Sequence, residues 1–275
     1  MDYKRVLTIQ DISCVGQCSL TVAMPILSAC GVEACVLPSA VLSTHTAFPG
    51  AVIRDLTEDM PRFAAHWQQI GIRFDAISCG YLGSQKQIEY VMDIFDTLVT
   101  ENCVKIVDPA MADHGKLYRG FDESFVGAMG KLCSKADYLI PNMTEACLLT
   151  GTPYQETYDR AFVEELLYNL QTLGPKNIIL TGATYTPGVT GVAVLSQGQI
   201  HCYGHEKLSG NRNGTGDIFA AAFAGALMRG NPTLKAAQIA ADYVCACIRN
   251  SSDDLDHWYG AKFEPTLPKL IEALE

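Results

Sequence analysis

The 275-residue sequence has no long hydrophobic run and few basic residues. Its longest strongly apolar segment, Ile218 to Met228, is much shorter than the roughly 18 residues that cross a bilayer. The chain starts with a short apolar segment and lacks the long hydrophobic region of a secretion signal. We therefore expect a protein that does not enter the membrane and that stays in the cytoplasm.

Lysine and arginine together number 20, against 30 aspartates and glutamates, so the formal net charge is −10. Proteins that bind the phosphate backbone of nucleic acids usually carry clustered basic residues. The acidic surplus therefore argues against nucleic acid as a partner. With 48% hydrophobic and 18% charged residues, the composition is typical of a folded globular protein.

The eleven cysteines include no C-x-x-C pair. Most lie in apolar segments, which favours reduced and buried thiols over disulfides or a zinc framework. The cysteines of this kind are Cys30, Cys35, Cys79, Cys147, Cys245 and Cys247.

Several familiar catalytic motifs are also missing. After Gly214 and Gly216, Phe219 stands where a dinucleotide-binding G-x-G-x-x-G motif needs its third glycine. Neither Gly115-Lys116 nor Gly130-Lys131 fits a Walker A motif. Because G-x-S-x-G and H-E-x-x-H motifs are absent as well, dehydrogenase, hydrolase and zincin functions are disfavoured.

Short β-type runs alternate with longer segments of helical period, which predicts an α/β fold with a mostly parallel sheet. No repeat or linker marks a boundary, so we expect one domain over residues 1–275. The expected strands are Arg5–Ile9, Glu33–Leu37, Ala76–Cys79, Lys105–Val107, Tyr138–Ile140 and Asn177–Leu180. The clearest expected helices are Ser19–Cys30, Glu58–Ile70 and Ser84–Thr100. A turn at Ser196 to Gln199 predicts a hairpin, and thus a sheet that is mixed at one edge.

The longest irregular region is predicted over Ser39 to Pro61. Loops of this length are often lids or binding loops, although a plain surface connection would have the same composition.

Polar or conformationally special residues recur where the expected strands end. Ligands of open α/β sheets bind beyond these carboxyl ends, but ordinary turns favour the same residues. The positions are Gln10-Asp11, Pro38-Ser39, Gly80-Tyr81, Asp108-Pro109, Pro141-Asn142 and Thr181-Gly182.

The strongest local signal is Gly214-Thr215-Gly216-Asp217, followed by the Ala-rich segment Ile218 to Met228. It predicts a buried helix whose first turn presents unpaired N–H groups and the positive end of the helix dipole. The glycines would let a phosphate approach these amides, as in an anion hole. Asp217 is then either an ordinary first-turn residue or the base that accepts a proton from a substrate hydroxyl.

A second carboxylate cluster is expected around Asn142-Met143-Thr144-Glu145. Asn142 suits a helix N-cap, and Glu145 suits the third position of a capping box. Glu145 could alternatively hold a water on Mg²⁺, with Asp108 and Asp113 adding acid nearby. Carboxylates this close to an anion hole would repel ATP unless Mg²⁺ lay between them.

In combination, these motifs and the early segments Leu7–Gln10 and Ser43–Thr46 resemble the ribokinase-like superfamily, and within it the pyridoxal/pyridoxamine kinases. The resemblance spans most of the chain. It implies a three-layer α/β/α fold and a homodimer. It also implies ATP-dependent phosphorylation of the 5'-hydroxymethyl group of a vitamin B6 compound, with Mg²⁺ and a monovalent cation such as K⁺.

The resemblance also implies roles for individual residues. Asp217 would be the general base, and Gly214, Thr215 and Gly216 would form the anion hole. Mg²⁺ would lie near Asp113 and Glu145. The residues implied to bind ATP are Asp108, Asn142, Glu145, Thr181 and Thr215. The residues implied on the vitamer side are Asp11, His45, Thr46, Tyr81 and Asp217, although His45 could instead be a loop histidine with internal partners.

One departure concerns the substrate. The family often has serine where this chain has Asp11, and a carboxylate there could shift the preference among pyridoxal, pyridoxamine and pyridoxine. The main alternative is a hydroxymethylpyrimidine kinase of thiamine biosynthesis, in which cysteine is common at the position of Asp217. A sugar kinase and a vitamer-binding protein without catalysis are further alternatives, and the intact Asp217 argues against the second of these.

Overall fold

The computed structural model describes residues 3–208, 212–252, 254 and 256–275. The strands are β1 (Arg5–Ser13), β2 (Glu33–Leu42), β3 (Ile53–Asp55), β4 (Phe74–Cys79), β5 (Val99–Val107), β6 (Ala112–Asp113), β7 (Lys116–Leu117), β8 (Tyr138–Leu139), β9 (Asn177–Thr186), β10 (Val189–Ser196) and β11 (Gln199–Glu206). The helices are α1 (Leu20–Ala29), α2 (Met60–Gln69), α3 (Gln85–Thr97), α4 (Glu123–Cys133), α5 (Met143–Thr150), α6 (Arg160–Gln171), α7 (Thr215–Met228), α8 (Thr233–Ser251) and α9 (Leu267–Ala273), with a 3₁₀ turn at Glu264–Thr266.

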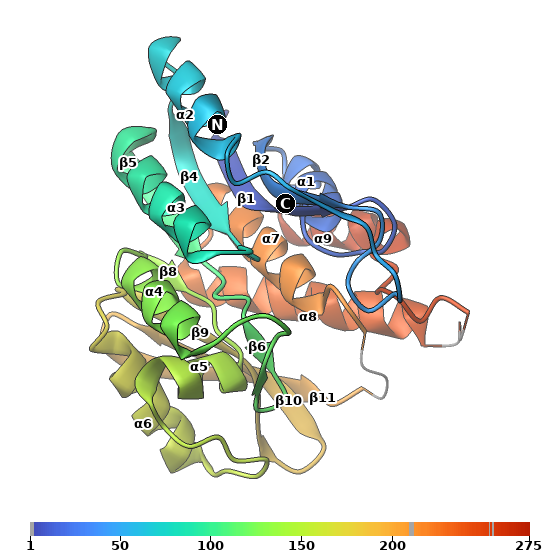
Figure 1. Ribbon diagram of the computed structural model, residues 1–275. Helices are drawn as coiled ribbons and strands as arrows, with labels where there is room; N and C mark the ends of the chain where they lie inside the picture. Colours follow the sequence, from blue (N-terminus) through green and yellow to red (C-terminus); the bar gives the residue numbers. More distant parts are fainter. Residues whose placement is uncertain (1–2, 209–211, 253, 255) are drawn as a thin grey trace.

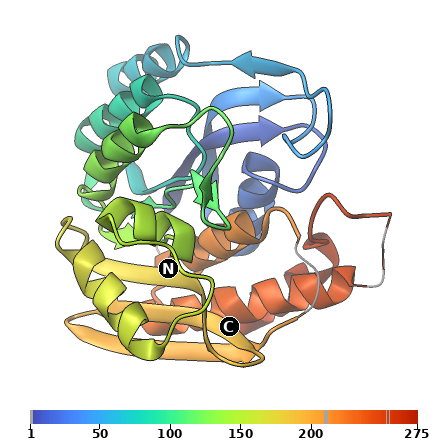
Figure 2. The same ribbon diagram turned by 60° about the horizontal axis from the view of Figure 1, so that its bottom comes forward.

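One nine-stranded sheet, in the order β11-β10-β9-β8-β5-β4-β1-β2-β3, organises the described part of the chain. The strands from β9 to β2 pair in parallel. The hairpin β10–β11 continues one edge in antiparallel pairing, as the sequence predicted. In addition, β3 pairs antiparallel with β2 at the opposite edge, so the sheet is mixed at both edges (Figure 2).

Helices cover both faces of this sheet and give the expected α/β/α layers (Figure 1). Helices α2 to α6 pack on one face, where Phe74, Phe95 and Leu139 are fully buried. Helices α1, α7, α8 and α9 pack on the other face around Phe223 and Ile26. Two apolar cores, one on each side of the sheet, therefore hold the strands in place.

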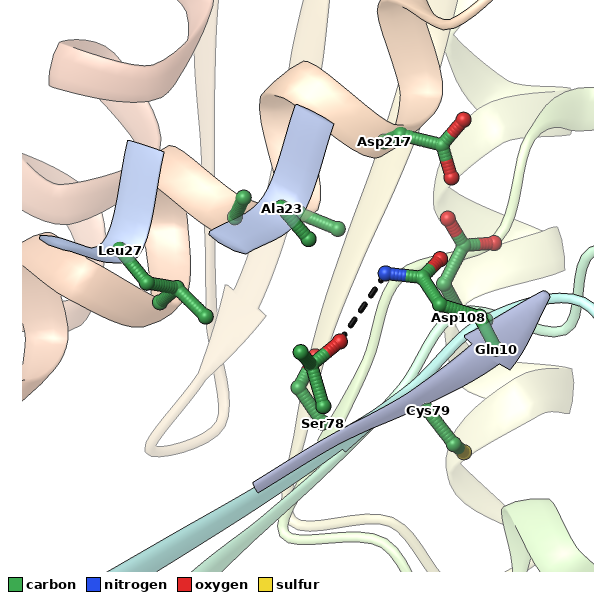
Figure 3. Close-up of a pocket in the computed structure, with 11 residues that line it drawn as sticks. Gln10, Ala23, Leu27, Ser78, Cys79, Asp108 and Asp217 are labelled. Carbon is green, nitrogen blue, oxygen red and sulfur yellow. Dashed lines mark hydrogen bonds between the residues drawn. The ribbon is translucent and has the colours of Figure 1, made fainter. Parts of the chain in front are cut away.

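Helix α7 is buried between the sheet and its neighbours α1 and α8. Its small residues allow this close packing. A Cβ at Gly225 would lie 2.3 Å from the sulfur of Cys30, the C-cap residue of α1. The predicted all-apolar helix after Asp217 is thus confirmed, and its N-terminus points toward the carboxyl ends of the central strands (Figure 3).

The region Ser39 to Pro61 is less irregular than predicted. Strand β2 passes through Pro38 and continues to Leu42, and β3 returns alongside it, so the loop between them covers only residues 43–52. Proline is tolerated because β3 pairs only with residues from Ala40 on, which leaves Pro38 at the sheet edge. Similarly, α3 ends at Thr97, and the Val99-Thr100 segment predicted as helix begins β5.

All eleven cysteines are free thiols, and six of them are buried. Of the cysteines that the sequence predicted to be buried, Cys35 is only partly buried. In the described residues, no helix is long and apolar enough to cross a membrane.

Candidate active site

The candidate site lies beyond the carboxyl ends of the central parallel strands. The chain runs from β1 to β2 on one side and later returns to place β4 on the other, so β1 and β4 flank a change in strand order. Crevices at such points are the usual ligand sites of open α/β sheets. A cavity with room for about one water lies there, between Thr8, Gln10, Ser78, Asp108 and Asp217.

Gly214 forms the entrance to α7 in a left-handed conformation, with φ 79°. A Cβ at this position would lie 1.8 Å from the carbonyl oxygen of Gln17, so the site requires glycine both for its backbone angle and for its space. No side chain of the described residues caps the helix. The amides of Thr215, Gly216 and Asp217 are therefore available to an anion, with the helix dipole behind them.

Asp217 lies in the first turn of α7 and faces Asp108, which follows β5 (Figure 3). Burial raises the pKa of Asp217 to about 7, with a smaller contribution from the charge of Asp11 and opposition from the backbone N–H of Ser19. A carboxylate whose pKa is close to neutral is suited to accept and release a proton.

Asp108 lies close to the anion hole, since a Cβ on Gly216 would be 3.9 Å from its Oδ2. Burial and the charge of Asp217 raise the pKa of Asp108, and no hydrogen bond from the described residues opposes them. Two facing carboxylates with raised pKa values need either a proton or a cation between them.

At the neighbouring strand end, Asn142 and Glu145 form the predicted capping box at the start of α5. Asn142 Oδ1 accepts from the Glu145 N–H at 2.9 Å, and Glu145 Oε2 accepts from the Asn142 N–H at 2.9 Å. The other Glu145 oxygen accepts from the Met111 N–H at 3.1 Å. Burial and Asp108 raise the pKa of Glu145 against these backbone bonds. Thr181 of β9 is beside this box, bridged to Asn142.

Only some of the nearby carboxylates are available as ligands for a hard divalent cation. Asp108 offers a carboxylate free of hydrogen bonds that lower its pKa, whereas both Glu145 oxygens already accept backbone N–H groups. Asp113 is exposed and pairs with His114. Among the described residues, no three Asp, Glu, His or Cys side chains form a ready-made metal cluster. Mg²⁺ commonly uses one or two carboxylates, its own waters and substrate phosphates, and this arrangement fits that pattern.

On the predicted vitamer side, Tyr81 follows β4 and is half-buried, with its ring 5.7 Å from that of Phe121. His45 is buried in an aromatic cluster with Phe48 and Trp258. Its Nδ1 accepts from the Ala47 N–H, so the ring network assigns the proton to Nε2, which donates to the Tyr259 carbonyl at 2.7 Å. Thr46 is exposed on the loop after β2.

Asp11 is buried, and β1 extends past it to Ser13. Its Oδ1 accepts from the Ser19 hydroxyl at 2.6 Å and its Oδ2 from the Ser13 hydroxyl at 3.0 Å. The contact of Ser19 with Asp11 is not evident from the sequence, because a serine before an apolar helix predicts only an N-cap. Tyr118 is a second such residue. Its phenol interacts electrostatically with the carboxylates of Glu145, Asp108, Asp113 and Asp217. No spacing pattern in the sequence indicates Tyr118.

Comparison with known proteins places these features in context. The family model for phosphomethylpyrimidine kinase matches residues 27–261. A pyridoxine/pyridoxal/pyridoxamine kinase of Bordetella pertussis is 28% identical over 261 residues, which cover 90% of this chain and 89% of that protein.

Two crystal structures share the fold at higher identity. Pyridoxal kinase from Lactobacillus plantarum is 33% identical with a TM-score of 0.90, covering 98% of this chain and 97% of that one. A candidate phosphomethylpyrimidine kinase from Bacteroides thetaiotaomicron, crystallised with pyridoxal, is 35% identical with a TM-score of 0.93, covering 98% and 96%.

Proposed function

Since the chain belongs to the phosphomethylpyrimidine kinase family of ribokinase-like proteins, together with the pyridoxal kinases it resembles, we propose that it phosphorylates vitamin B6 vitamers. ATP is the phosphate donor, and the acceptor is the 5'-hydroxymethyl group of pyridoxal, pyridoxamine or pyridoxine. The product serves the salvage of pyridoxal 5'-phosphate. The whole chain acts as a single kinase domain.

The observation that carries this proposal is Asp217 at the mouth of an uncapped helix N-terminus. In this role the Asp217 carboxylate accepts the proton of the acceptor hydroxyl as the hydroxyl oxygen attacks the γ-phosphorus of ATP. The bond between the γ-phosphorus and the β–γ bridging oxygen breaks, and ADP leaves. The amides of Thr215 and Gly216 donate to the oxygens of the phosphoryl group and stabilise its charge. Phosphoryl transfer needs little more from a protein than this positioning and electrostatic stabilisation.

Asp108, Asp113 and Glu145 are the residues that would hold Mg²⁺, which would neutralise part of the phosphate charge. Asp108 is the best direct ligand, because the Glu145 oxygens are engaged by backbone N–H groups. Asn142 and Thr181 then lie on the ATP side, next to the capping box. We assign Asp11, His45, Thr46 and Tyr81 to the acceptor side on the strength of the family resemblance. A monovalent cation, a homodimer and a cytoplasmic location belong to the proposal on the strength of the family resemblance.

The function is tested by ADP release with Mg²⁺-ATP against five acceptors in parallel: pyridoxal, pyridoxamine, pyridoxine, hydroxymethylpyrimidine and ribose. We expect turnover with at least one B6 vitamer and much slower turnover with ribose. Turnover with hydroxymethylpyrimidine alone would replace the B6 proposal by the thiamine-pathway alternative, which the matching family model keeps in view. Binding of pyridoxal without turnover of any acceptor would indicate a non-catalytic vitamer-binding protein.

A further inference from the structure

The start of α7 has no capping side chain among the described residues, so contacts with other parts of the chain must hold its first turn in place. Gln17, in the loop between β1 and α1, packs directly against it. A Cβ on Gly214 would lie 1.8 Å from the carbonyl oxygen of Gln17, and a Cβ on Gly260 would lie 2.7 Å from the Cβ of Gln17. Gln17 is therefore held between these two glycines, and its position limits where Gly214 can lie.

The side chain of Gln17 is fixed at both of its polar atoms. Its Nε2 donates to the Glu264 carboxylate, 2.8 Å from Oε1 and 2.7 Å from Oε2. An ionised carboxylate only accepts, so the amide oxygen of Gln17 faces the other way, toward Nε2 of His257 at 2.6 Å. Because that oxygen also only accepts, the proton of this hydrogen bond is assigned to Nε2 of His257. The ring of His257 therefore donates to Gln17 and fixes the orientation of its side chain.

Arg212 lies two residues before Gly214 and joins the start of α7 to the end of α8 and the segment after it. Its guanidinium donates to the carbonyl oxygens of His257 at 3.0 Å and Ser251 at 2.7 Å. Its own carbonyl oxygen accepts from the Thr215 hydroxyl at 3.3 Å. Because a guanidinium is a rigid planar fork of donors, it holds several acceptors in one fixed arrangement.

His257 is the residue that these two sets of contacts share. Its ring binds Gln17, and its backbone carbonyl binds Arg212. It is half-buried, and its ring packs on that of Tyr259 with the centroids 4.2 Å apart. The contacts of His257 therefore connect the residue that packs against Gly214 with the residue two positions before Gly214.

We propose that His257 is a positioning residue for the anion hole: it braces the entrance of α7 through Gln17 on one side and through Arg212 on the other. The inference rests on the proposed function of the Thr215 and Gly216 amides in phosphoryl transfer. Such amides stabilise the transition state only when they are already in place, and displacements of about 1 Å can cost a hundredfold in rate. His257 then affects the rate of transfer more than the binding of either substrate.

The kinetic test compares His257→Ala with a matched control, Asn250→Ala. Asn250 also holds the segment after α8, by donating to the Lys262 carbonyl at 3.2 Å, but this hydrogen bond reaches neither Gln17 nor Arg212. We expect kcat to fall about tenfold or more in His257→Ala, equally with all three vitamers and with the KM for each vitamer unchanged. Asn250→Ala should stay within about threefold of the wild-type kcat.

Further variants separate positioning from a general loss of structure. His257→Gln keeps a side-chain N–H donor toward Gln17 and should recover most of the lost rate. Adding His257→Ala to Gln17→Ala should lower kcat no further than Gln17→Ala alone, because both changes break the same contact. Arg212→Ala removes the second contact and should also lower kcat about tenfold or more.

Several kinetic results would overturn the proposal. These are a wild-type kcat in His257→Ala or in Arg212→Ala, and no recovery in His257→Gln. A higher KM for the vitamers at constant kcat in His257→Ala would do so as well, because it would assign His257 to the acceptor side.

Amide hydrogen exchange gives a readout that needs no activity. The Ile218 N–H donates to the Gly214 carbonyl at 2.9 Å and closes the first turn of α7. It should exchange about tenfold faster in His257→Ala than in the wild type and at an unchanged rate in Asn250→Ala, whereas the Phe223 N–H in the middle of α7 should keep its wild-type rate. Unchanged exchange at Ile218 would overturn the proposal. So would an equal increase at Ile218 and Phe223, because it would mean a general loss of stability.

The two kinds of measurement also separate this inference from the proposed function. If the wild-type protein phosphorylates no vitamer, the proposed function fails. The exchange rates then still decide whether His257 holds the start of α7.

Discussion

Two helices begin beyond the carboxyl ends of the parallel strands, α5 on one face of the sheet and α7 on the other, and their N-termini are built in opposite ways. Helix α5 is closed by its own side chains, because Asn142 and Glu145 satisfy each other's backbone N–H groups. Helix α7 starts at a left-handed glycine and has no capping side chain among the described residues. A capped N-terminus stabilises the fold, whereas an uncapped one keeps its amides and its dipole for a ligand. The difference indicates which of the two similar acidic segments performs the chemistry.

The largest effect on catalysis is expected at α7, the helix whose N-terminus is uncapped. Asp217→Ala should lower kcat by about a hundredfold or more and leave ATP affinity largely intact, because a general base acts mainly in the transition state. Asp159→Ala is the matched control, since Asp159 is also an N-terminal aspartate but only caps the Phe162 N–H of α6. That variant should lose about 1 kcal/mol of stability and keep its turnover. Similar kcat values for the two variants would remove Asp217 from the base role.

The left-handed glycine of α7 should be the next most sensitive position. Gly214→Ala pushes a methyl group against the Gln17 carbonyl and should lower kcat/KM for ATP about tenfold or more. Gly151 at the end of α5 has a similar φ of 67° but open space around it. Gly151→Ala should therefore lose about 1 kcal/mol of stability from backbone strain with near-normal kinetics. Equal kinetic losses in both variants would mean that strain alone accounts for the effect.

The pH dependence should follow the ionisation of Asp217. Burial raises its pKa to about 7, and only the deprotonated form can accept a proton. We expect kcat/KM to fall about tenfold for each pH unit below 7 and to level off above it. Profiles measured with two vitamers show whether the ionising group belongs to the enzyme or to the substrate. An ionising group of the enzyme gives the same fall at low pH with both vitamers. A flat profile between pH 5 and 7 would contradict the assignment.

The smallest effect on catalysis is expected at α5, the helix whose N-terminus is capped. Asn142→Ala removes the cap of α5 and should lower the free energy of unfolding by about 1 kcal/mol in a denaturant titration. The change in kcat should be less than about threefold. A rise in KM for ATP without any loss of stability would show that Asn142 serves the nucleotide more than the helix.

The sequence predicted the layers and the parallel core of the fold because apolar periodicity reports directly on burial. It missed β3, whose three residues are all exposed and therefore lack a buried face that would reveal them. It also ended β1 and β2 too early, because Asp11 and Ser39 look like turn residues and in fact lie within strands.

Local motifs predicted the two helix N-termini, since glycine pairs and capping boxes are encoded over a few residues. The contact between Ser19 and Asp11 could not be predicted, because it depends on the backbone angles of one serine and on a carboxylate 8 residues before it. The position of Tyr118 could not be predicted either, because only the fold brings it near the carboxylates.

The most direct test of the central claim is phosphorus-31 NMR of the products formed from Mg²⁺-ATP and pyridoxal. The account predicts that a phosphomonoester on the 5'-oxygen appears as ATP is consumed, and that its rate of formation falls about a hundredfold or more in Asp217→Ala. ATP consumption that yields only inorganic phosphate, or ester formation at the wild-type rate in Asp217→Ala, would contradict it.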